Sequence, residues 1–492
     1  MKFLITLQSQ KISFFCALAK YLFSIKHQIY FSFISKDVHS IVEQNIEPFY
    51  KYEISKDKTT KFDNRDLLKE ALNYEKKYNL NFSYIIFQDR ALGRGHIINA
   101  TSIPKIKRSS WSKEKKIEEI LSKFYYYEDL LDRVKPDVIL SITQKEILDI
   151  VAKKRNIPYY ALVDAKFEDR YRWTDTIATS NIFLKSITKN LTKANSELSD
   201  FNKNLSHPHY AHVLHSRVKY SYLEGFKGFV ITFLKEIYKN IRGSNKKNSY
   251  VFPGWATSNL KRPYIYSYIS KIGKKIEDLN DQKIVYIPLQ LEPEISLLSF
   301  SPEFTNQFEM ISWISKSLPA NYTIVVREQP NAFGSRPKWY YKKLQEMGNV
   351  VFSHPKTLGM DWIRKSNFVA TITGTAAFEG VLLEKSVLSF GKHQAVNLLP
   401  TVKYCTNYES TLKSFEELVN TDKQKFIFSK KVLYNSILNS SFSLKNFEVI
   451  TNSEIAVAGN KFSEDVKELA IQCGEKLIDE LKNINNKHEK NK

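Results

Sequence analysis

The ten residues TITGTAAFEG, at positions 371–380, decide the fold of the second half of this chain. The run FVATIT (368–373) is short, apolar and rich in β-branched residues, which predicts a buried strand. The Gly374–Thr375 pair predicts a turn and a helix cap, residues 376–383 a helix, and VLSF (387–390) the next strand. Such a unit leaves backbone N–H groups at the carboxyl end of the first strand, where an anion can bind.

The same alternation of strands and helices extends in both directions along the chain. Strands are expected at residues 2–7, 29–34, 84–87, 137–142, 159–163, 284–289, 322–327 and 350–352. Helices are expected between them, at residues 12–26, 111–134, 145–155, 303–318, 338–347 and 360–365. Strands that alternate with helices form parallel sheets covered on both faces. The predicted fold class is therefore α/β, with two Rossmann-like domains facing a cleft and a helical insertion between them.

The domain boundaries follow from changes in this alternation of predicted strands and helices. Between the two alternating regions, helical periodicity dominates up to residue 250, and a linker with Pro253, Gly254 and Pro263 precedes a helix at 266–279. The predicted organisation is an N-terminal Rossmann-like domain (1–175), a helical insertion and linker (176–282), a C-terminal Rossmann-like domain (283–440), and a helical segment with a frayed tail (441–492).

The composition indicates a globular protein with an anionic partner. Hydrophobic residues make up 42% of the 492 residues, which is enough for a sizeable core. Lys and Arg number 74 against 52 Asp and Glu, a net charge of +22. A nucleotide, a phosphorylated glycan or a membrane surface would suit this charge. The alternative is that the Lys-rich composition, and so the positive charge, only reflects an AT-rich genome. Nucleic-acid binding is not expected, because no motif for it accompanies the charge.

Cysteine and histidine positions argue against a disulfide framework and a metal site. Cys16, Cys405 and Cys473 are far apart and form no CxxC motif, which fits a reducing cytosol. The cluster His207, His209, His212 and His215 has no cysteine or acidic residue at zinc-like spacing. The apolar run at the N-terminus covers only residues 3–7, too short for a signal peptide. We therefore expect a cytoplasmic protein without metal or cofactor.

One segment could meet a membrane without crossing it. FKGFVITFLKEIYKNI (226–241) is amphipathic and basic, so it could lie on an anionic membrane surface. The alternative is a helix whose apolar side faces the core and whose lysine-rich side faces solvent. Peripheral attachment to the inner face of the cell membrane is the first of these two hypotheses.

Three strand ends in the second half carry polar residues suited to binding an anionic sugar derivative. They bring Gln290, Glu292 and Glu294; Arg327, Glu328 and Gln329; and Thr373, Gly374, Thr375 and Glu379. The ends of parallel strands meet at one edge of a sheet, where ligands bind. A guanidinium such as Arg327 and N–H groups near Gly374 suit a phosphate, and a carboxylate such as Glu379 suits ribose hydroxyls. These residues together predict a nucleotide-sugar site.

The segments around these strand ends resemble a known family. YIPLQLEPE (286–294), LPANYTIVVREQP (318–330) and TITGTAAFEGVLLEKSVLSFG (371–391) are similar to bacterial capsule and surface-polysaccharide biosynthesis proteins. That family includes transferases of Kdo (3-deoxy-manno-octulosonic acid) with the two-domain GT-B fold. The resemblance is strongest over residues 283–395 and weaker over 84–175. It implies a glycosyltransferase that uses a CMP- or UDP-sugar and a glycan or lipid-linked acceptor.

Two departures from the family pattern affect the expected chemistry. The family pattern VKEHP corresponds here to Val326–Pro330, where Gln329 replaces the histidine. A glutamine can donate to and accept from a sugar or phosphate, but it cannot act as an acid or base. The family's Gly-Lys-Pro-Val corresponds to Glu384–Val387, which keeps only the lysine and the valine. These changes affect the donor's identity more than the fold.

The first half offers candidates for the acceptor side. The GRGH sequence at 93–96 places Arg94 in a glycine turn, where it could contact an acceptor or a donor phosphate. Asp164 and Glu168 follow the strand expected at 159–163, and a transferase needs a carboxylate to deprotonate the acceptor hydroxyl. Glu294 competes for the same catalytic role from the other domain. For each of them an ordinary surface position is the alternative.

The sequence thus predicts a GT-B glycosyltransferase of capsule or lipopolysaccharide assembly, with CMP-Kdo as one candidate donor. Arg327, Gly374 and Thr375 would hold phosphate, Glu379 the ribose, and Gln290, Gln329 and Thr373 the sugar side of the site. One alternative is a sugar-nucleotide 2-epimerase, which shares the two-domain layout but needs no acceptor. Another is a non-catalytic protein of polysaccharide assembly or export.

Overall fold

The structure, a computed structural model, describes residues 1–7, 11–33, 50–54, 64–93, 108–176, 180–201, 205, 221–241, 252–292, 294–301, 303–453 and 463–490. The chain divides into two compact units that exchange segments. Unit 1 comprises residues 1–82, 117–182 and 437–492, and unit 2 comprises residues 83–116 and 183–436. Both units are α/β with mainly parallel sheets, which confirms the predicted α/β class with two Rossmann-like sheets.

Unit 1 is built on a sheet whose described strands have the order β13-β6-β5-β4-β1-β2-β3. They are β1 (Lys2–Leu7), β2 (Gln28–Phe33), β3 (Tyr50–Ile54), β4 (Val138–Ser141), β5 (Tyr159–Asp164), β6 (Arg170–Thr174) and β13 (Phe442–Ser443). Strands β1 to β5 are parallel, and β6 and β13 add antiparallel pairs at one edge. The strand order reverses beside β1, so β1 and β4 flank the topological switch point of this sheet.

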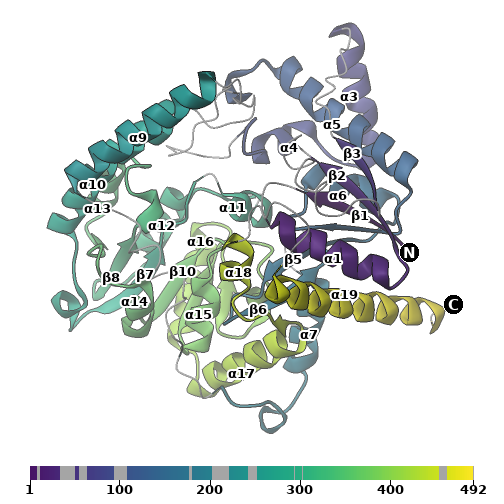
Figure 1. Cartoon of the computed structure of the whole chain (residues 1–492). Helices are drawn as coiled ribbons and strands as arrows, with labels where there is room; N and C mark the ends of the chain where they lie inside the picture. The colour runs from purple at the N-terminus through teal and green to yellow at the C-terminus, as the bar shows by residue number, and fades with distance from the viewer. Residues whose placement is uncertain are drawn as a thin grey trace. The chain divides into compact units, whose positions relative to one another are not determined.

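Helices from the two ends of the chain cover one face of this sheet. Helix α1 (Ile12–Ser24) and helix α19 (Glu464–Lys490) lie side by side (Figure 1). Gly474 allows this close approach, because a Cβ atom there would lie 2.4 Å from the Tyr21 ring. The Trp173 indole N–H donates to the Cys473 carbonyl at 3.0 Å, which ties α19 to β6. The C-terminal helix is therefore part of the unit 1 core.

Further helices of the chain's first part are α3 (Asn64–Tyr78), α4 (Phe82–Gln88), α5 (Lys113–Val134) and α6 (Glu146–Lys154), followed near the C-terminus by α18 (Phe447–Ser453). Phe82 and Tyr74 pack on the Phe124 ring of α5 at centroid distances of 5.8 and 5.7 Å. These contacts fix helices α3 and α5 against each other, away from the face that α1 and α19 cover.

Unit 2 is built on a parallel sheet whose described strands have the order β12-β11-β10-β7-β8-β9. They are β7 (Lys283–Pro288), β8 (Tyr322–Arg327), β9 (Val350–Phe352), β10 (Phe368–Thr371), β11 (Ser386–Ser389) and β12 (Val402–Tyr404). The chain runs outward from β7 to β8 and β9, and then returns to the other side at β10. The switch point of this sheet therefore lies between β7 and β10.

Helices cover both faces of the second sheet. On one face, α10 (Phe252–Ile272), α12 (Gln307–Ser317), α13 (Lys338–Gln345) and α16 (Tyr408–Val419) share a core with alternate strand residues such as Val285 and Val326. On the other face, α14 (Gly359–Lys365) contacts β7, and α15 (Ala376–Leu382) contacts β10 and β11. Other described α-helices that lie mainly in unit 2 are α7 (Asn181–Leu191), α9 (Tyr222–Ile241), α11 (Ile295–Phe300) and α17 (Lys423–Asn439).

Most predicted elements of the second half are confirmed. Strands β8 and β9 have the predicted bounds, and α12 begins later than predicted, because the Asn306 side chain accepts hydrogen bonds from the N–H groups of Phe308 and Glu309. The linker predicted around Pro253 and Pro263 is instead part of helix α10, which accommodates Pro263 in its interior.

The strand predicted at residues 84–87 is wrong. These residues lie in helix α4, where Phe82 and Ile85 are buried at helical spacing. A run of four apolar residues is too short for its periodicity to separate strand from helix. The antiparallel strand β6 was not predicted at all, and helix α19 continues to Lys490, into the tail that was expected to fray.

Two further observations concern membrane-spanning helices and predicted residues outside the described part of the chain. No helix in the described part of the chain combines the length and apolar character needed to cross a bilayer. Arg94 and the histidine cluster at residues 207–215 lie outside the described residues.

Candidate functional site

The carboxyl edge of the second sheet is bridged at its switch point by two predicted residues. Gln290 follows β7 and Thr373 follows β10, and both side chains are buried. The Gln290 amide donates to Thr373 Oγ1 at 2.6 Å and accepts from the Thr373 backbone N–H at 3.3 Å. Because both amide atoms are engaged with Thr373, Gln290 links the two strand ends.

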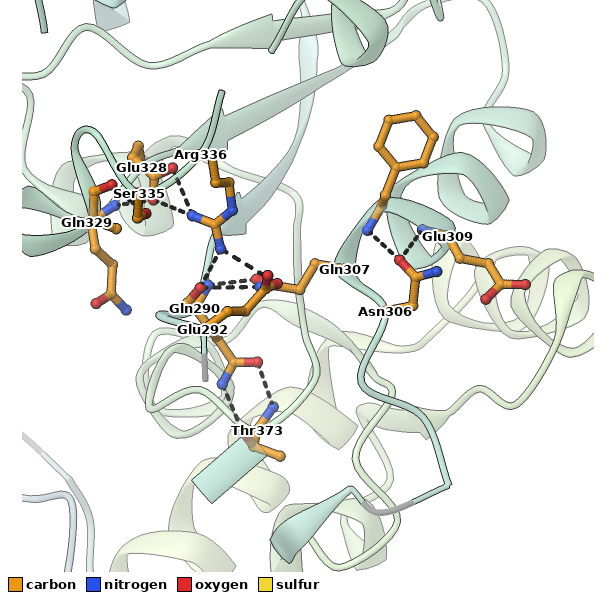
Figure 2. Close-up of polar contacts among 12 residues, drawn as sticks. Gln290, Glu292, Asn306, Gln307, Glu309, Glu328, Gln329, Ser335, Arg336 and Thr373 are labelled. Carbon is orange, nitrogen blue, oxygen red and sulfur yellow. Dashed lines mark hydrogen bonds and ion pairs between the residues drawn. The ribbon is translucent and has the colours of Figure 1, made fainter. Parts of the chain in front are cut away.

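A buried network of charged and amide side chains continues from this bridge (Figure 2). Arg336 Nη1 donates to both carboxylate oxygens of Glu328 at 2.7 Å, and Arg336 Nη2 donates to the Gln290 carbonyl at 2.5 Å. Gln307 of α12 accepts from the Gln290 backbone N–H at 2.5 Å and donates to Glu292. The loops after β7 and β8 are thereby held to each other by groups with almost no solvent exposure.

The electrostatics of this network favour its ionised form. Burial alone would lower the pKa of the Arg336 guanidinium, but Glu328 and Glu292 outweigh burial and raise it well above its usual value. Burial and the Glu328 charge likewise raise the pKa of Tyr341, whose hydroxyl donates to Glu328 Oε2 at 2.8 Å. A guanidinium that donates to both carboxylate oxygens and makes further hydrogen bonds offsets much of the cost of burying the charges.

A second polar group lies on the opposite face of the same sheet edge. Arg327, at the end of β8, donates from Nε to the Thr357 carbonyl at 3.1 Å. Burial raises the pKa of the Tyr286 hydroxyl to about 12; the nearby Arg327 charge lowers it and the Glu379 charge raises it. Arg327 and Glu379 therefore both lie close enough to Tyr286 to act on the same hydroxyl. The sequence predicted both residues for one site, and the charges of both act on this one hydroxyl.

Gly359, the first residue of α14, completes this group. A Cβ atom at that position would lie 2.9 Å from the Tyr286 hydroxyl and 3.8 Å from Arg327 Nη1. The backbone of α14 thus comes against both polar side chains, and a larger residue would displace them. Arg327 and Glu379 are half-buried, so each side chain keeps contact with solvent.

The turn at Gly374 and Thr375 differs from the sequence-based prediction in its hydrogen bonds. The Gly374 N–H donates to Thr371 Oγ1 at 3.0 Å, so this N–H is occupied within the turn. Thr375 stands at the cap position of α15 with helical backbone angles, and its side chain makes no capping hydrogen bond. Thr375 therefore occupies the predicted cap position without a capping bond, and this half-buried residue lies at the same sheet edge.

The two other predicted residues of this edge are Gln329, which follows β8, and Glu294, which follows β7. Gln329 is half-buried directly after Glu328, and its backbone N–H donates to Glu328 Oε1 at 3.0 Å. Glu294 occupies the cap position of α11 with extended backbone angles. It makes no side-chain cap to that helix.

The predicted catalytic residues of unit 1 lie in the turn between β5 and β6. Asp164 is exposed at the end of β5, and its carboxylate accepts from the Lys166 N–H at 2.6 Å. Glu168 is exposed with a backbone φ of 48°, in the left-handed region that most residues avoid. The carboxyl ends of β1, β4 and β5 share one edge because these strands are parallel, so Asp164 lies at the carboxyl edge of the first sheet.

Sequence reasoning missed three residues that organise the second sheet edge. Arg336 lies in a loop without periodicity, Gln307 opens a helix, and Tyr286 sits inside a strand. The one available signal was Tyr286, a hydroxyl-bearing side chain at a position that alternates with core residues. No sequence signal marked Arg336, because arginine is rarely buried and its pairing depends on tertiary contacts.

The comparisons with known proteins give similarity in structure only. No protein-family model and no curated protein matches this chain. Among solved structures, a putative UDP-N-acetylglucosamine 2-epimerase from Listeria monocytogenes is 9% identical, with 94% of this chain and 99% of that chain covered and a TM-score of 0.27.

Two glycosyltransferases are among the other matches. The spinosyn rhamnosyltransferase SpnG, solved with spinosyn aglycone, is 10% identical over 89% of this chain and 97% of its own, with a TM-score of 0.28. KpsC from Thermosulfurimonas dismutans, a beta Kdo 2,7 transferase, is 14% identical over 65% of this chain and 88% of its own, with a TM-score of 0.29. At this level of similarity, function must be inferred from the residues themselves.

Proposed function

We propose that this protein is a GT-B glycosyltransferase that binds a nucleotide-sugar at the carboxyl edge of the second sheet. The observation that supports the proposal is that the charges of Arg327, at the end of β8, and Glu379, in α15, both act on the Tyr286 hydroxyl, against which the Gly359 backbone also lies. A guanidinium suits a phosphate and a carboxylate suits the ribose hydroxyls of a nucleotide. The half-buried position of both side chains leaves them accessible to such a ligand.

The buried network supports this assignment by fixing the loops around the site. Gln290 and Thr373 are joined across the switch point, and Arg336 holds the loops after β7 and β8 together. A binding site held by its supporting contacts loses less entropy when a ligand binds. We therefore assign Gln290, Thr373 and Gly374 a positioning role, and Thr375 and Gln329 a role in contacting phosphate and sugar.

The catalytic base is proposed among three carboxylates. Asp164 and Glu168 would serve from the acceptor side, with Arg94 as an acceptor or phosphate contact, and Glu294 would serve from the donor side. Each would deprotonate the acceptor hydroxyl that attacks the sugar. We propose a glycan or lipid-linked acceptor of capsule or lipopolysaccharide assembly, a CMP- or UDP-sugar such as CMP-Kdo as donor, and a location at the inner face of the cell membrane.

Thermal-shift screening of the full chain with CMP-, UDP- and GDP-sugars tests the donor site. A ligand that binds the native state raises the melting temperature by mass action. For the sugar that responds, we expect Arg327→Met to weaken binding about 10- to 100-fold, because a charge-assisted contact contributes about 1.5–3 kcal/mol. Glu379→Gln should weaken binding about tenfold.

Arg364→Met is the matched control, because Arg364 is an exposed arginine of α14 paired with Asp361 at 3.3 Å. It should leave nucleotide-sugar binding unchanged. Unchanged binding in both Arg327→Met and Glu379→Gln would rule out this site.

The same preparations separate the alternative functions. An epimerase would convert UDP-N-acetylglucosamine without any acceptor, whereas a glycosyltransferase requires one. A non-catalytic assembly protein would keep its cellular function when Arg327 and Glu379 are replaced by alanine.

A further inference from the structure

Helix α9 packs on α10 through its small residues rather than its apolar ones. A Cβ atom at Gly225 would lie 2.5 Å from the Asn259 carbonyl oxygen, and one at Gly228 would lie 3.3 Å from the Asn259 side chain. Thr232 Oγ1 accepts from Asn259 Nδ2 at 3.4 Å on the same side of the helix. The spacing of these residues, three and four positions apart, defines one narrow stripe along α9 that faces α10.

The large apolar residues of α9 are left exposed. Eight of them are among the exposed hydrophobic residues of the described chain: Tyr222, Leu223, Phe226, Ile231, Phe233, Leu234, Ile237 and Tyr238. Leu223 is 65% exposed and Leu234 is 58% exposed. Phe229 stacks between Phe226 and Phe233 at centroid distances of 6.5 and 6.4 Å, which forms an aromatic ridge along the helix.

This arrangement excludes one of the two hypotheses drawn from the sequence. A helix that buries its apolar side against the core and turns a lysine-rich side to solvent does not fit, because the apolar side of α9 is the exposed one. Contiguous exposed apolar surface of this kind marks an interaction site. We call this surface, formed by the eight residues named above, the α9 face.

Exposed lysines beside the α9 face suit an anionic partner. Lys227 forms an i,i+3 pair with Glu224 at 3.8 Å on α9. Lys227 and Lys235 are exposed on α9 itself, beside the apolar residues. An exposed apolar helix side with aromatic residues and flanking lysines suits the interface of an anionic bilayer, in which rings enter the headgroup region and lysines meet phosphates.

We propose that the α9 face binds the surface of an anionic phospholipid membrane, with α9 lying in the plane of the interface. Exposed Leu260 and Tyr264 of α10 lie on the neighbouring helix and are available to extend the contact. The proposal deepens the proposed function, on which it rests for the identity of a membrane-bound acceptor, but lipid binding itself requires no nucleotide-sugar. It names the surface by which the enzyme reaches that acceptor.

Flotation of the full chain with phospholipid vesicles tests this proposal. The protein should float with vesicles of phosphatidylglycerol and phosphatidylcholine, and much less with phosphatidylcholine alone, and salt should weaken the binding. The double variant Leu223→Ser/Leu234→Ser should bind at least tenfold more weakly, because both leucines would leave the bilayer interface. The matched control is Leu68→Ser/Leu72→Ser, two exposed leucines of α3 in unit 1, which should bind like the parent chain.

Each other outcome overturns the proposal. Absence of flotation by the parent chain excludes a lipid surface, and so does equal flotation of the double variant. If the parent chain is a dimer that the double variant converts to a monomer without any lipid binding, the α9 face is a contact between copies instead. The nucleotide-sugar thermal shift should be the same in all of these variants, so a failure here is distinct from a failure of the donor site.

Discussion

Buried charge is paired at the carboxyl edge of the second sheet, whereas one desolvated lysine near the corresponding edge of the first sheet has no ion pair among the described residues. In unit 2, Arg336 holds both oxygens of Glu328 at 2.7 Å. In unit 1, Lys145 follows β4, and the one contact of its ammonium group found among the described residues is the Tyr127 ring, 5.8 Å away. Burial lowers the pKa of Lys145 to about 8.

The contrast separates two uses of buried charge. A paired charge fixes loops, and removing one partner leaves the other charge without compensation. An unpaired charge destabilises the native state as long as it stays ionised, so its removal should have the opposite effect. The two edges therefore predict mutational effects of opposite sign.

The largest effect is expected for Arg336→Met in unit 2. The variant leaves Glu328 buried without its cation, which should cost about 3–5 kcal/mol of unfolding free energy. Urea unfolding of the full chain measures this loss. The control is Lys343→Met, in an exposed pair with Glu346 at 2.6 Å, which should change stability by at most about 1 kcal/mol. Equal effects of the two substitutions would show that the Arg336 network does not stabilise unit 2.

The next effect is expected for Thr373→Val, which keeps the side-chain shape and removes the hydroxyl. Gln290 Nε2 then loses its acceptor at 2.6 Å in a buried position, which should cost about 1–3 kcal/mol. The same urea experiment measures it, with the exposed Thr406→Val as the control. A loss no greater than that of the control would mean that the bridge across the switch point does not stabilise the edge.

A smaller effect of opposite sign is expected for Lys145→Met in unit 1. At pH 7 the native state carries an ionised, largely desolvated lysine, so its removal should raise stability by about 1–2 kcal/mol. Between pH 8 and about 10.5 the unfolded chain binds more protons at this lysine than the native state, so parent stability should gain from rising pH. The variant should lack this gain.

The control for Lys145→Met is Lys154→Met, an exposed lysine of α6. It should leave the pH profile of thermal unfolding unchanged. A destabilised Lys145→Met variant at pH 7 would show that Lys145 is compensated after all.

The sequence predicted the edge of the second sheet but not its internal supports. Continuous apolar runs identified β7, β8 and β10, and the rule that parallel strands end on one edge brought Gln290 and Thr373 together. Arg336 could not be found in this way, because it lies in a loop whose sequence has no hydrophobic periodicity.

Helix α9 shows a different limit. Its amphipathic pattern was visible, but the side that is buried depends on the partner helix. Gly225 and Gly228 form a second stripe that suits α10 better than the apolar side does. The sequence-based prediction therefore left two hypotheses, and tertiary packing removed one of them.

The smallest effect is expected for Glu480→Gln in α19, which tests a second desolvated ionisable group of unit 1. Burial, with a contribution from Asp175, raises the pKa of Glu480 to about 8. Between the ordinary glutamate pKa of about 4.5 and pH 8, the native state binds more protons than the unfolded chain, so this residue lowers stability as the pH rises. The variant should match the parent near pH 5 and exceed it by about 1 kcal/mol at pH 8. Thermal unfolding at both pH values measures the difference, with the exposed Glu475→Gln of the same helix as the control. An advantage of Glu480→Gln that is equal at both pH values would come from packing rather than from charge, and the contrast between the units would then rest on Lys145 alone.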